Sequence, residues 1–181
     1  MLGTTLFILS TVFVQQTMDF TAKLTPSEKG HAYLDQSMPE GIKLKTLDGK
    51  PYILKVDTPT LVQVWSVCCG GDTTQWADQR YTEQVYTKRG LRVISINLEN
   101  GKDGIQQKKI LNDFFKTKPK PNELYLDTLG YAYDELSVRG FPTFILINKD
   151  GKLIFRTGDK SKEGMALLES EIQNLLDELN D

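Results

Sequence analysis

The two cysteines of this chain are neighbours in the sequence, and their thiols are the side chains best suited to chemistry. Cys68 and Cys69 are the only cysteines among 181 residues. Consecutive Cα atoms lie about 3.8 Å apart, whereas an ordinary disulfide spans about 4.4–6.8 Å. The only disulfide that this chain could form within itself is therefore a strained one between neighbours. A stabilising disulfide framework is excluded, and the cysteines do not indicate a redox compartment.

Two interpretations of Cys68 are open. It could act with Cys69 as a vicinal redox couple or as a soft thiolate pair for Cu(I), or it could be a small, half-buried apolar side chain. A metal site needs further ligands, and the only histidine, His31, lies in a polar stretch that no pattern places near the cysteines. We therefore expect neither a metal nor another cofactor.

Asp72 follows the cysteines by one helical turn and opposes the activation of Cys69. A helix N-terminus stabilises a thiolate by about 0.3–1 kcal/mol, and by up to about 2 in partly buried sites. A carboxylate at ~6 Å destabilises it by roughly 3 kcal/mol at a dielectric of ~20, before water reduces that figure. The two effects are comparable, so the sequence predicts a Cys69 pKa not far below the free value of about 8.5. Asp72 could instead simply cap the helix.

Hydrophobic periodicity predicts the elements that position these residues. Strands alternate with helices, which is typical of an α/β fold with a central mixed sheet, helices on both faces and an N-terminal β-hairpin. The predicted strands are 42–47, 52–54, 60–65, 91–98, 123–126, 143–147 and 153–155. The predicted helices are 72–89, a segment around 110–115, 131–137 and the tail from 162.

Apolar spacing also predicts the buried faces of two helices. In helix 72–89, which Gly90 ends, the face is formed by Ala77, Tyr81 and Val85. In the tail helix, it is formed by Leu168, Ile172, Leu175 and Leu179.

The N-terminal region predicts export. The apolar stretch 6–14 resembles that of a secretory signal and is too short to span a bilayer comfortably. We assign 1–17 to a signal peptide, 18–37 to a linker and 38–181 to the domain, which would place the protein in the periplasm or otherwise outside the cytoplasm. A start at Met18 would leave it in the cytoplasm, and both alternatives stay open. The net charge of −2 and the lack of a basic stripe exclude nucleic-acid binding.

Two separated segments carry a family resemblance. The first is Val-Trp-Ser-Val-Cys-Cys-Gly-Gly-Asp at 64–72, where a strand runs into a helix, and the second is Val-Arg-Gly-Phe-Pro-Thr-Phe-Ile-Leu-Ile-Asn-Lys-Asp-Gly at 138–151. Together they resemble the bacterial TlpA/ResA-type group of thioredoxin-like proteins, over about residues 38–181. The resemblance implies a thioredoxin-like fold and descent from a thiol-disulfide oxidoreductase.

The resemblance also assigns the site, residue by residue. Cys69 takes the place of the nucleophile, and Asp72 replaces the resolving cysteine. Trp65 matches the first tryptophan of the motif, and Cys68 stands where the second one usually is. Pro142 matches the family's cis-proline, whose loop faces the nucleophile and pairs with an extended partner chain.

Other departures from the family pattern weaken dithiol chemistry. Gln63 and Gln75 stand where thioredoxin and ResA-type proteins carry proton-handling carboxylates. A conventional dithiol reductase is therefore disfavoured, because it needs a second cysteine to release the mixed disulfide. A peroxiredoxin is disfavoured too, since Val62 and Ser66 stand at the Pro and Thr places of its motif.

The sequence leaves two functions open. The first is a single-thiol protein that forms mixed disulfides through Cys69 with protein thiols or a small thiol. The second is a redox-inactive module that recognises an extended peptide segment of a partner protein at the Pro142 groove. In both, the predicted substrate-contacting residues are Cys68, Asp72, Trp65, Phe141 and Pro142.

Overall fold

The computed structural model describes residues 36–70, 73–99 and 101–179. The predicted signal peptide and nearly all of the predicted linker lie outside the described residues. The strands are β1 (Lys43–Thr46), β2 (Pro51–Ile53), β3 (Thr60–Trp65), β4 (Arg92–Asn97), β5 (Glu123–Leu126), β6 (Thr143–Ile147) and β7 (Leu153–Thr157). The helices are α1 (Val67–Gly70), α2 (Thr73–Tyr86), η2 (Thr87–Arg89), α3 (Gly104–Phe114), α4 (Tyr131–Glu135) and α5 (Lys162–Asp177).

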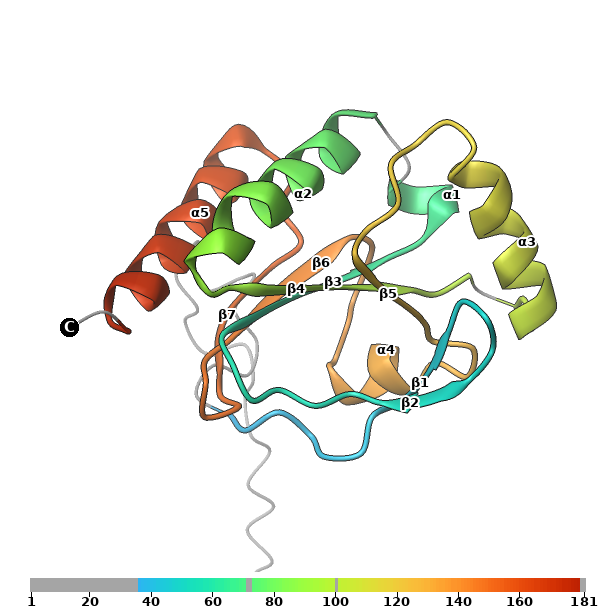
Figure 1. Cartoon of the computed structure of the whole chain (residues 1–181), viewed down its shortest axis with the longest axis horizontal. Helices are drawn as coiled ribbons and strands as arrows, with labels where there is room; N and C mark the ends of the chain where they lie inside the picture. Colours follow the sequence, from blue (N-terminus) through green and yellow to red (C-terminus); the bar gives the residue numbers. More distant parts are fainter. Residues whose placement is uncertain (1–35, 71–72, 100, 180–181) are drawn as a thin grey trace, which may run out of the picture.

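The strands form one mixed sheet in the order β2-β1-β5-β4-β3-β6-β7. At its centre, β3 pairs in parallel with β4 and antiparallel with β6, and every residue of β3 is buried. Helices α2 and α5 cover one face of the sheet, and α4 lies on the opposite face (Figure 1). This arrangement confirms the predicted α/β class.

Both predicted hairpins form, and glycines make their turns. Gly49 in the β1–β2 turn and Gly151 in the β6–β7 turn have φ values of 89° and 76°, in the left-handed region that glycine adopts without strain. Strand β1 also pairs antiparallel with β5, which attaches the first hairpin to the sheet.

The helices begin and pack differently from the prediction in three places. The helical conformation starts at Val67, in the separate turn α1, and not at Asp72. Tyr81 is 56% exposed, so the predicted face of α2 is wrong there, and Trp76 and Tyr86 are buried instead. Leu179 lies beyond the end of α5 and is 40% exposed, while Leu176 takes its expected place in the core.

The chain approaches its first strand from the far edge of the sheet. Ser37 forms a bridge with Lys152 in the β6–β7 hairpin. Met38 donates its backbone N–H to Gly151 O at 2.7 Å, and Leu153 donates to Gln36 O at 2.9 Å. Residues 36–38 are thus attached to the β6–β7 hairpin, although β1 lies near the other edge.

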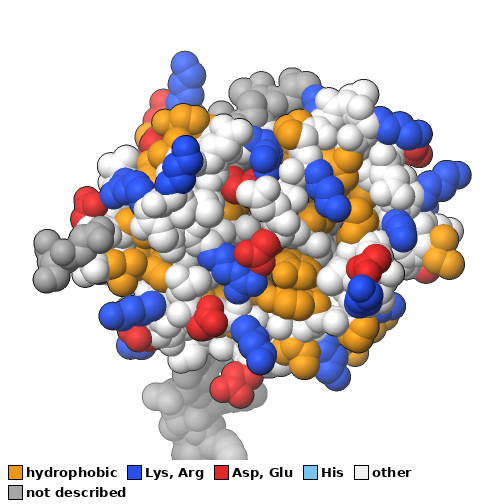
Figure 2. Space-filling model, viewed as in Figure 1, with side chains coloured by type: hydrophobic (Ala, Val, Ile, Leu, Met, Phe, Trp, Pro, Cys, Tyr) orange, Lys and Arg blue, Asp and Glu red, His pale blue; other side chains and the backbone are white. Residues whose placement is uncertain are grey.

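Surface charge shows no segregation by sign on the face viewed in Figure 2, where basic and acidic side chains are interspersed. In the described part of the chain, no helix is long and apolar enough to cross a membrane.

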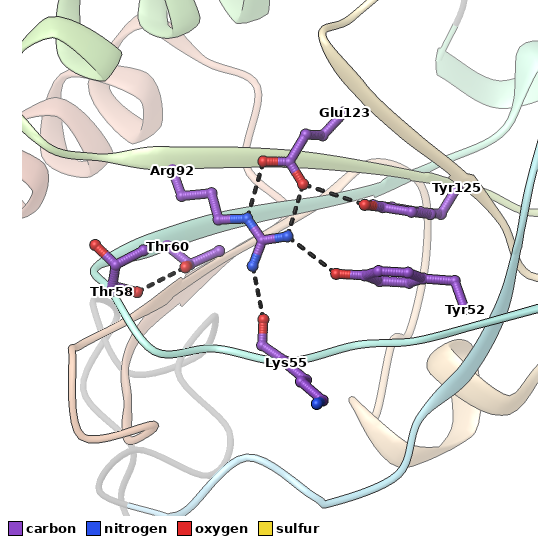
Figure 3. A network of polar contacts seen from close by, with 7 residues as sticks. All are labelled: Tyr52, Lys55, Thr58, Thr60, Arg92, Glu123 and Tyr125. Atoms are coloured by element: carbon purple, nitrogen blue, oxygen red, sulfur yellow. Dashed lines mark hydrogen bonds and ion pairs between the residues drawn. The ribbon is translucent and has the colours of Figure 1, made fainter.

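A half-buried ion pair between β4 and β5 also contacts the first hairpin (Figure 3). Arg92 on β4 donates Nε–H and Nη2–H to the two carboxylate oxygens of Glu123 on β5, at 2.9 and 2.7 Å. It also donates to Lys55 O at 2.7 Å and to the Tyr52 hydroxyl at 3.0 Å. Tyr52 stacks on Tyr125 with ring centroids 4.0 Å apart. One guanidinium therefore connects β2, β4, β5 and the chain after β2.

We expect Arg92→Met to lower the free energy of unfolding by about 2 kcal/mol, because Glu123 and the Lys55 carbonyl lose a charged donor. The matched control is Arg89→Met, which breaks a more exposed pair with Asp177 and should cost less than about 1 kcal/mol. Urea unfolding of both variants measures the difference. Equal losses would contradict the structural role of Arg92.

Candidate functional site

Both cysteines lie in the helical turn that follows the central strand. After β3 ends at Trp65, Ser66 leads directly into α1, which contains Cys68 and Cys69. Both thiols are free and exposed, and their Sγ atoms are 2.7 Å apart. The interpretation of Cys68 as a half-buried apolar side chain is therefore wrong.

A buried carboxylate lies at the start of α1. Glu99, which follows β4, is only 6% exposed. Its Oε1 accepts hydrogen bonds from the Val67 backbone N–H at 2.6 Å and from Asn97 Nδ2 at 3.0 Å, and its Oε2 accepts one from Ser66 Oγ at 2.9 Å. Parallel strands β3 and β4 end at the same edge of the sheet. That pairing brings Glu99 beneath α1.

Polar contacts continue from Glu99 in two directions. Toward the surface, Ser66 Oγ lies 3.2 Å from Cys68 Sγ. Toward the interior, Gln107 on α3 donates Nε2–H to Asn97 O at 2.6 Å and to Asn97 Oδ1 at 3.0 Å. With its Oδ1 accepting from Gln107, Asn97 directs its amide hydrogens toward Glu99 and the Trp65 carbonyl.

Two tryptophans support the site from below. Trp65 is 1% exposed and donates Nε1–H to Ser95 Oγ at 2.7 Å. Its ring centroid is 4.7 Å from that of Trp76 on α2, and both rings contact Phe114 and Phe115. Trp65 thus packs inside the protein in this structure. Its predicted contact with a substrate stays a prediction.

The loop before β6 contains the predicted cis-proline. The Phe141–Pro142 peptide bond is cis, Pro142 is buried, and Phe141 packs edge-on against Tyr133 with centroids 5.7 Å apart. Gly158 lies against this loop, since a Cβ there would be 3.4 Å from Pro142 O. Two residues later, the charge of Lys160 acts on Cys69. Residues 158–160 therefore contain both a close neighbour of Pro142 and a charge that favours the thiolate of Cys69.

The environment of Cys69 opposes ionisation. The hydrogen bond with Cys68 contributes most to raising the pKa of Cys69 above its ordinary value, followed by desolvation and the charges of Cys68 and Glu99, while Lys160 lowers it. The sequence predicted a pKa slightly below the ordinary value, with Asp72 as the opposing charge. The pKa of Cys69 is thus raised and not lowered, through the neighbouring thiol and Glu99. Asp72 lies outside the described residues, so its predicted effect on this pKa stays a prediction.

Some predicted site residues cannot be placed. Asp72 lies outside the described residues, so its predicted substrate contact and its capping role stay predictions. Gln63, at the position of thioredoxin's carboxylate, is 2% exposed, and its Oε1 has no hydrogen-bond partner within the described part of the chain. Within that same part, no group of three or more His, Cys, Asp or Glu residues could hold a metal ion.

Sequence reasoning missed Glu99 and Ser66 as parts of the site. A signal was present, because Glu99 follows the apolar strand 91–98 without a break. An acidic residue at the carboxyl end of a central strand lies where functional groups gather in α/β sheets.

No family model and no curated protein matches this sequence. Solved structures do match its fold. A structure described as a thiol:disulfide interchange protein, DsbE, from Chlorobium tepidum has a TM-score of 0.68 at 20% identity, covering 79% of this chain and 97% of that one. The chain has a thioredoxin-like fold.

Two further thioredoxin-like structures agree. The exposed lipoprotein thioredoxin of Streptococcus pneumoniae has a TM-score of 0.55 at 22% identity, covering 71% of this chain and 97% of that one. A secreted disulfide oxidoreductase of Mycobacterium tuberculosis has a TM-score of 0.56 at 13% identity, covering 75% of this chain and 96% of that one. These structures confirm the fold that the two sequence segments predicted.

We expect Cys68→Ala to lower the pKa of Cys69, because it removes the hydrogen bond that favours the thiol form most. The Cβ chemical shift of Cys69, followed by NMR from neutral to alkaline pH, measures this pKa at equilibrium. The pKa of Cys69 should be higher in the native wild type than in the urea-unfolded chain, and it should be lower in Cys68→Ala than in the native wild type. Glu178→Gln, on an exposed residue at the end of α5, is the control that leaves it unchanged. A Cys69 pKa that is the same with and without Cys68 would contradict the assigned cause.

Proposed function

We propose that this thioredoxin-like protein forms mixed disulfides through Cys69 with cysteines of partner proteins or with small thiols. The observation that carries the proposal is an exposed, free thiol in the helical turn directly after the central strand of a thioredoxin-like fold. The structural neighbours named as thiol-disulfide exchange proteins support the same chemistry.

The exchange proceeds through a single thiol. Cys69 loses its proton and attacks a disulfide of the partner, forming one bond to the proximal sulfur while the partner's sulfur–sulfur bond breaks. The distal sulfur leaves as a thiolate and then takes up a proton. Asp72 stands where a second cysteine would release the adduct, and Cys68 could do so only through a strained disulfide between neighbours. The mixed disulfide therefore persists until an external thiol attacks it.

A second candidate function is peptide recognition without redox turnover, at a groove beside Pro142 that involves Phe141. One observation favours it, which is the raised pKa of Cys69, because a protonated thiol is a poor nucleophile. Under this alternative, an extended peptide binds equally well to the wild type and to Cys69→Ser.

We also place the domain outside the cytoplasm. The apolar stretch near the N-terminus supports this, as do a neighbour described as secreted and another described as an exposed lipoprotein. Thiol exchange with partner proteins suits such compartments, where disulfides form and persist.

We expect the reduced full-length chain to take up one glutathionyl group from oxidised glutathione, located on Cys69 by fragment mass spectrometry. Cys69→Ser should lose the adduct by more than about tenfold, whereas Cys68→Ser should still carry it on Cys69. Glu178→Gln, on an exposed residue, is the control that should react like the wild type. The adduct should survive until dithiothreitol is added. If Cys69→Ser is modified at Cys68 as fast as the wild type is modified at Cys69, Cys69 is not the reactive thiol. If the wild type forms no adduct, peptide recognition becomes the leading function.

A further inference from the structure

An unbroken line of contacts connects the exposed thiols to the buried carboxylate. Cys69 Sγ is 2.7 Å from Cys68 Sγ, Cys68 Sγ is 3.2 Å from Ser66 Oγ, and Ser66 Oγ is 2.9 Å from Glu99 Oε2. Ser66 is fully buried, so no bulk water takes its place between Cys68 and Glu99.

The direction of these hydrogen bonds follows from counting protons. Ser66 has a single hydroxyl hydrogen, which it donates to Glu99 Oε2. Ser66 Oγ therefore accepts from the Cys68 thiol, and Cys68 Sγ in turn accepts from the Cys69 thiol. Every donor in the line points toward Glu99.

Glu99 is held in place to receive a proton on one particular oxygen. Its Oε1 is occupied by the Val67 N–H and by Asn97 Nδ2, so only Oε2 faces Ser66. The positions of thioredoxin's and ResA's carboxylates contain Gln63 and Gln75 in this chain, and an amide cannot accept a proton in this way at neutral pH.

We propose that Glu99 is the proton acceptor for Cys69, and that the proton moves through Cys68 and Ser66. The proposal rests on the mixed-disulfide function above. As Cys69 Sγ attacks a disulfide, its proton passes to Cys68 Sγ, the Cys68 proton to Ser66 Oγ, and the Ser66 proton to Glu99 Oε2. The distal sulfur leaves as a thiolate and takes up a proton, after which Glu99 loses its own to restore the starting state. Overall, one thiol and one disulfide give one mixed disulfide and one thiol.

The alternative is that Glu99 acts on Cys69 only as a charge. The titratable and charged groups with the largest effects on Cys69 in the described structure are Cys68 on α1, Glu99 after β4 and Lys160 before α5. As a charge alone, Glu99 disfavours the thiolate, and its neutralisation should speed the reaction of Cys69. As a proton acceptor, its removal should slow that reaction. The two roles predict opposite signs.

The test measures the rate at which DTNB modifies Cys69 in the reduced full-length chain, with the label located by fragment mass spectrometry. At neutral pH, we expect Glu99→Gln and Ser66→Ala each to slow the reaction by about tenfold or more, the lower end of the range for general bases. Between slightly acidic and neutral pH, the wild-type rate should stay nearly flat, whereas the variants should lose about tenfold per pH unit because they react only through preformed thiolate. The NMR shift of Cys69 Cβ should show that Glu99→Gln lowers the equilibrium pKa while the rate falls.

Glu178→Gln is the matched control and should react like the wild type. Heat unfolding confirms that each variant is folded, and Ser66→Ala keeps the test valid if Glu99→Gln does not fold. If both variants react as fast as the wild type or faster, the relay is overturned and the mixed-disulfide function stands. The relay is also overturned if the wild-type rate at neutral pH equals the rate expected from its preformed Cys69 thiolate alone. If the wild type forms no adduct at all, both proposals fail.

Discussion

The buried carboxylate of Glu99 is satisfied only while the ends of two neighbouring strands stay together. A carboxylate without partners in a protein interior costs several kcal/mol, and its donors here are Ser66 and Val67 after β3 and Asn97 at the end of β4. Separating the strand ends would leave that charge unpaired. The start of α1, and with it both cysteines, is therefore fixed to the most buried part of the sheet.

The rest of the site follows from this attachment. Below the thiols, Trp65 and Trp76 connect the end of β3 to α2, and the rings of Phe114 and Phe115 add α3. A rigid base thus supports exposed sulfur atoms. The surroundings of the sulfur atoms favour the thiol form, because the Cys68 thiol and the charge of Glu99 both raise the pKa of Cys69. The fold is thioredoxin-like, and in the relay proposed above the proton acceptor is Glu99, which follows β4.

The sequence indicated most of the helices and strands, and it named Cys69 and Pro142 as candidate site residues but not Glu99. Alternating apolar residues and the Asp-Gly pairs predicted both hairpins, since local chemistry determines such turns. Cys69 and Pro142 could be named as candidates because each lies in a recognisable local pattern. Glu99 could not be named from a local pattern, because its partners Ser66 and Val67 lie 33 and 32 residues away in the sequence. Only the parallel pairing of β3 and β4 brings Glu99 close to them. The prediction that Tyr81 is buried was wrong for a related reason. The spacing of an aromatic residue along a helix does not reveal which side of the helix packs against the sheet.

The attachment of residues 36–38 to the β6–β7 hairpin determines how the protein would face a surface. Strand β3 begins beside the end of β6 and runs toward the cysteines, since Thr60 pairs with Ile147 and Val64 with Thr143. The hairpin and the thiols are thus separated by the length of a six-residue strand, roughly 20 Å. A tether that enters through residue 36 would join the domain at the pole opposite to the thiols, so the cysteines would point away from whatever holds the tether.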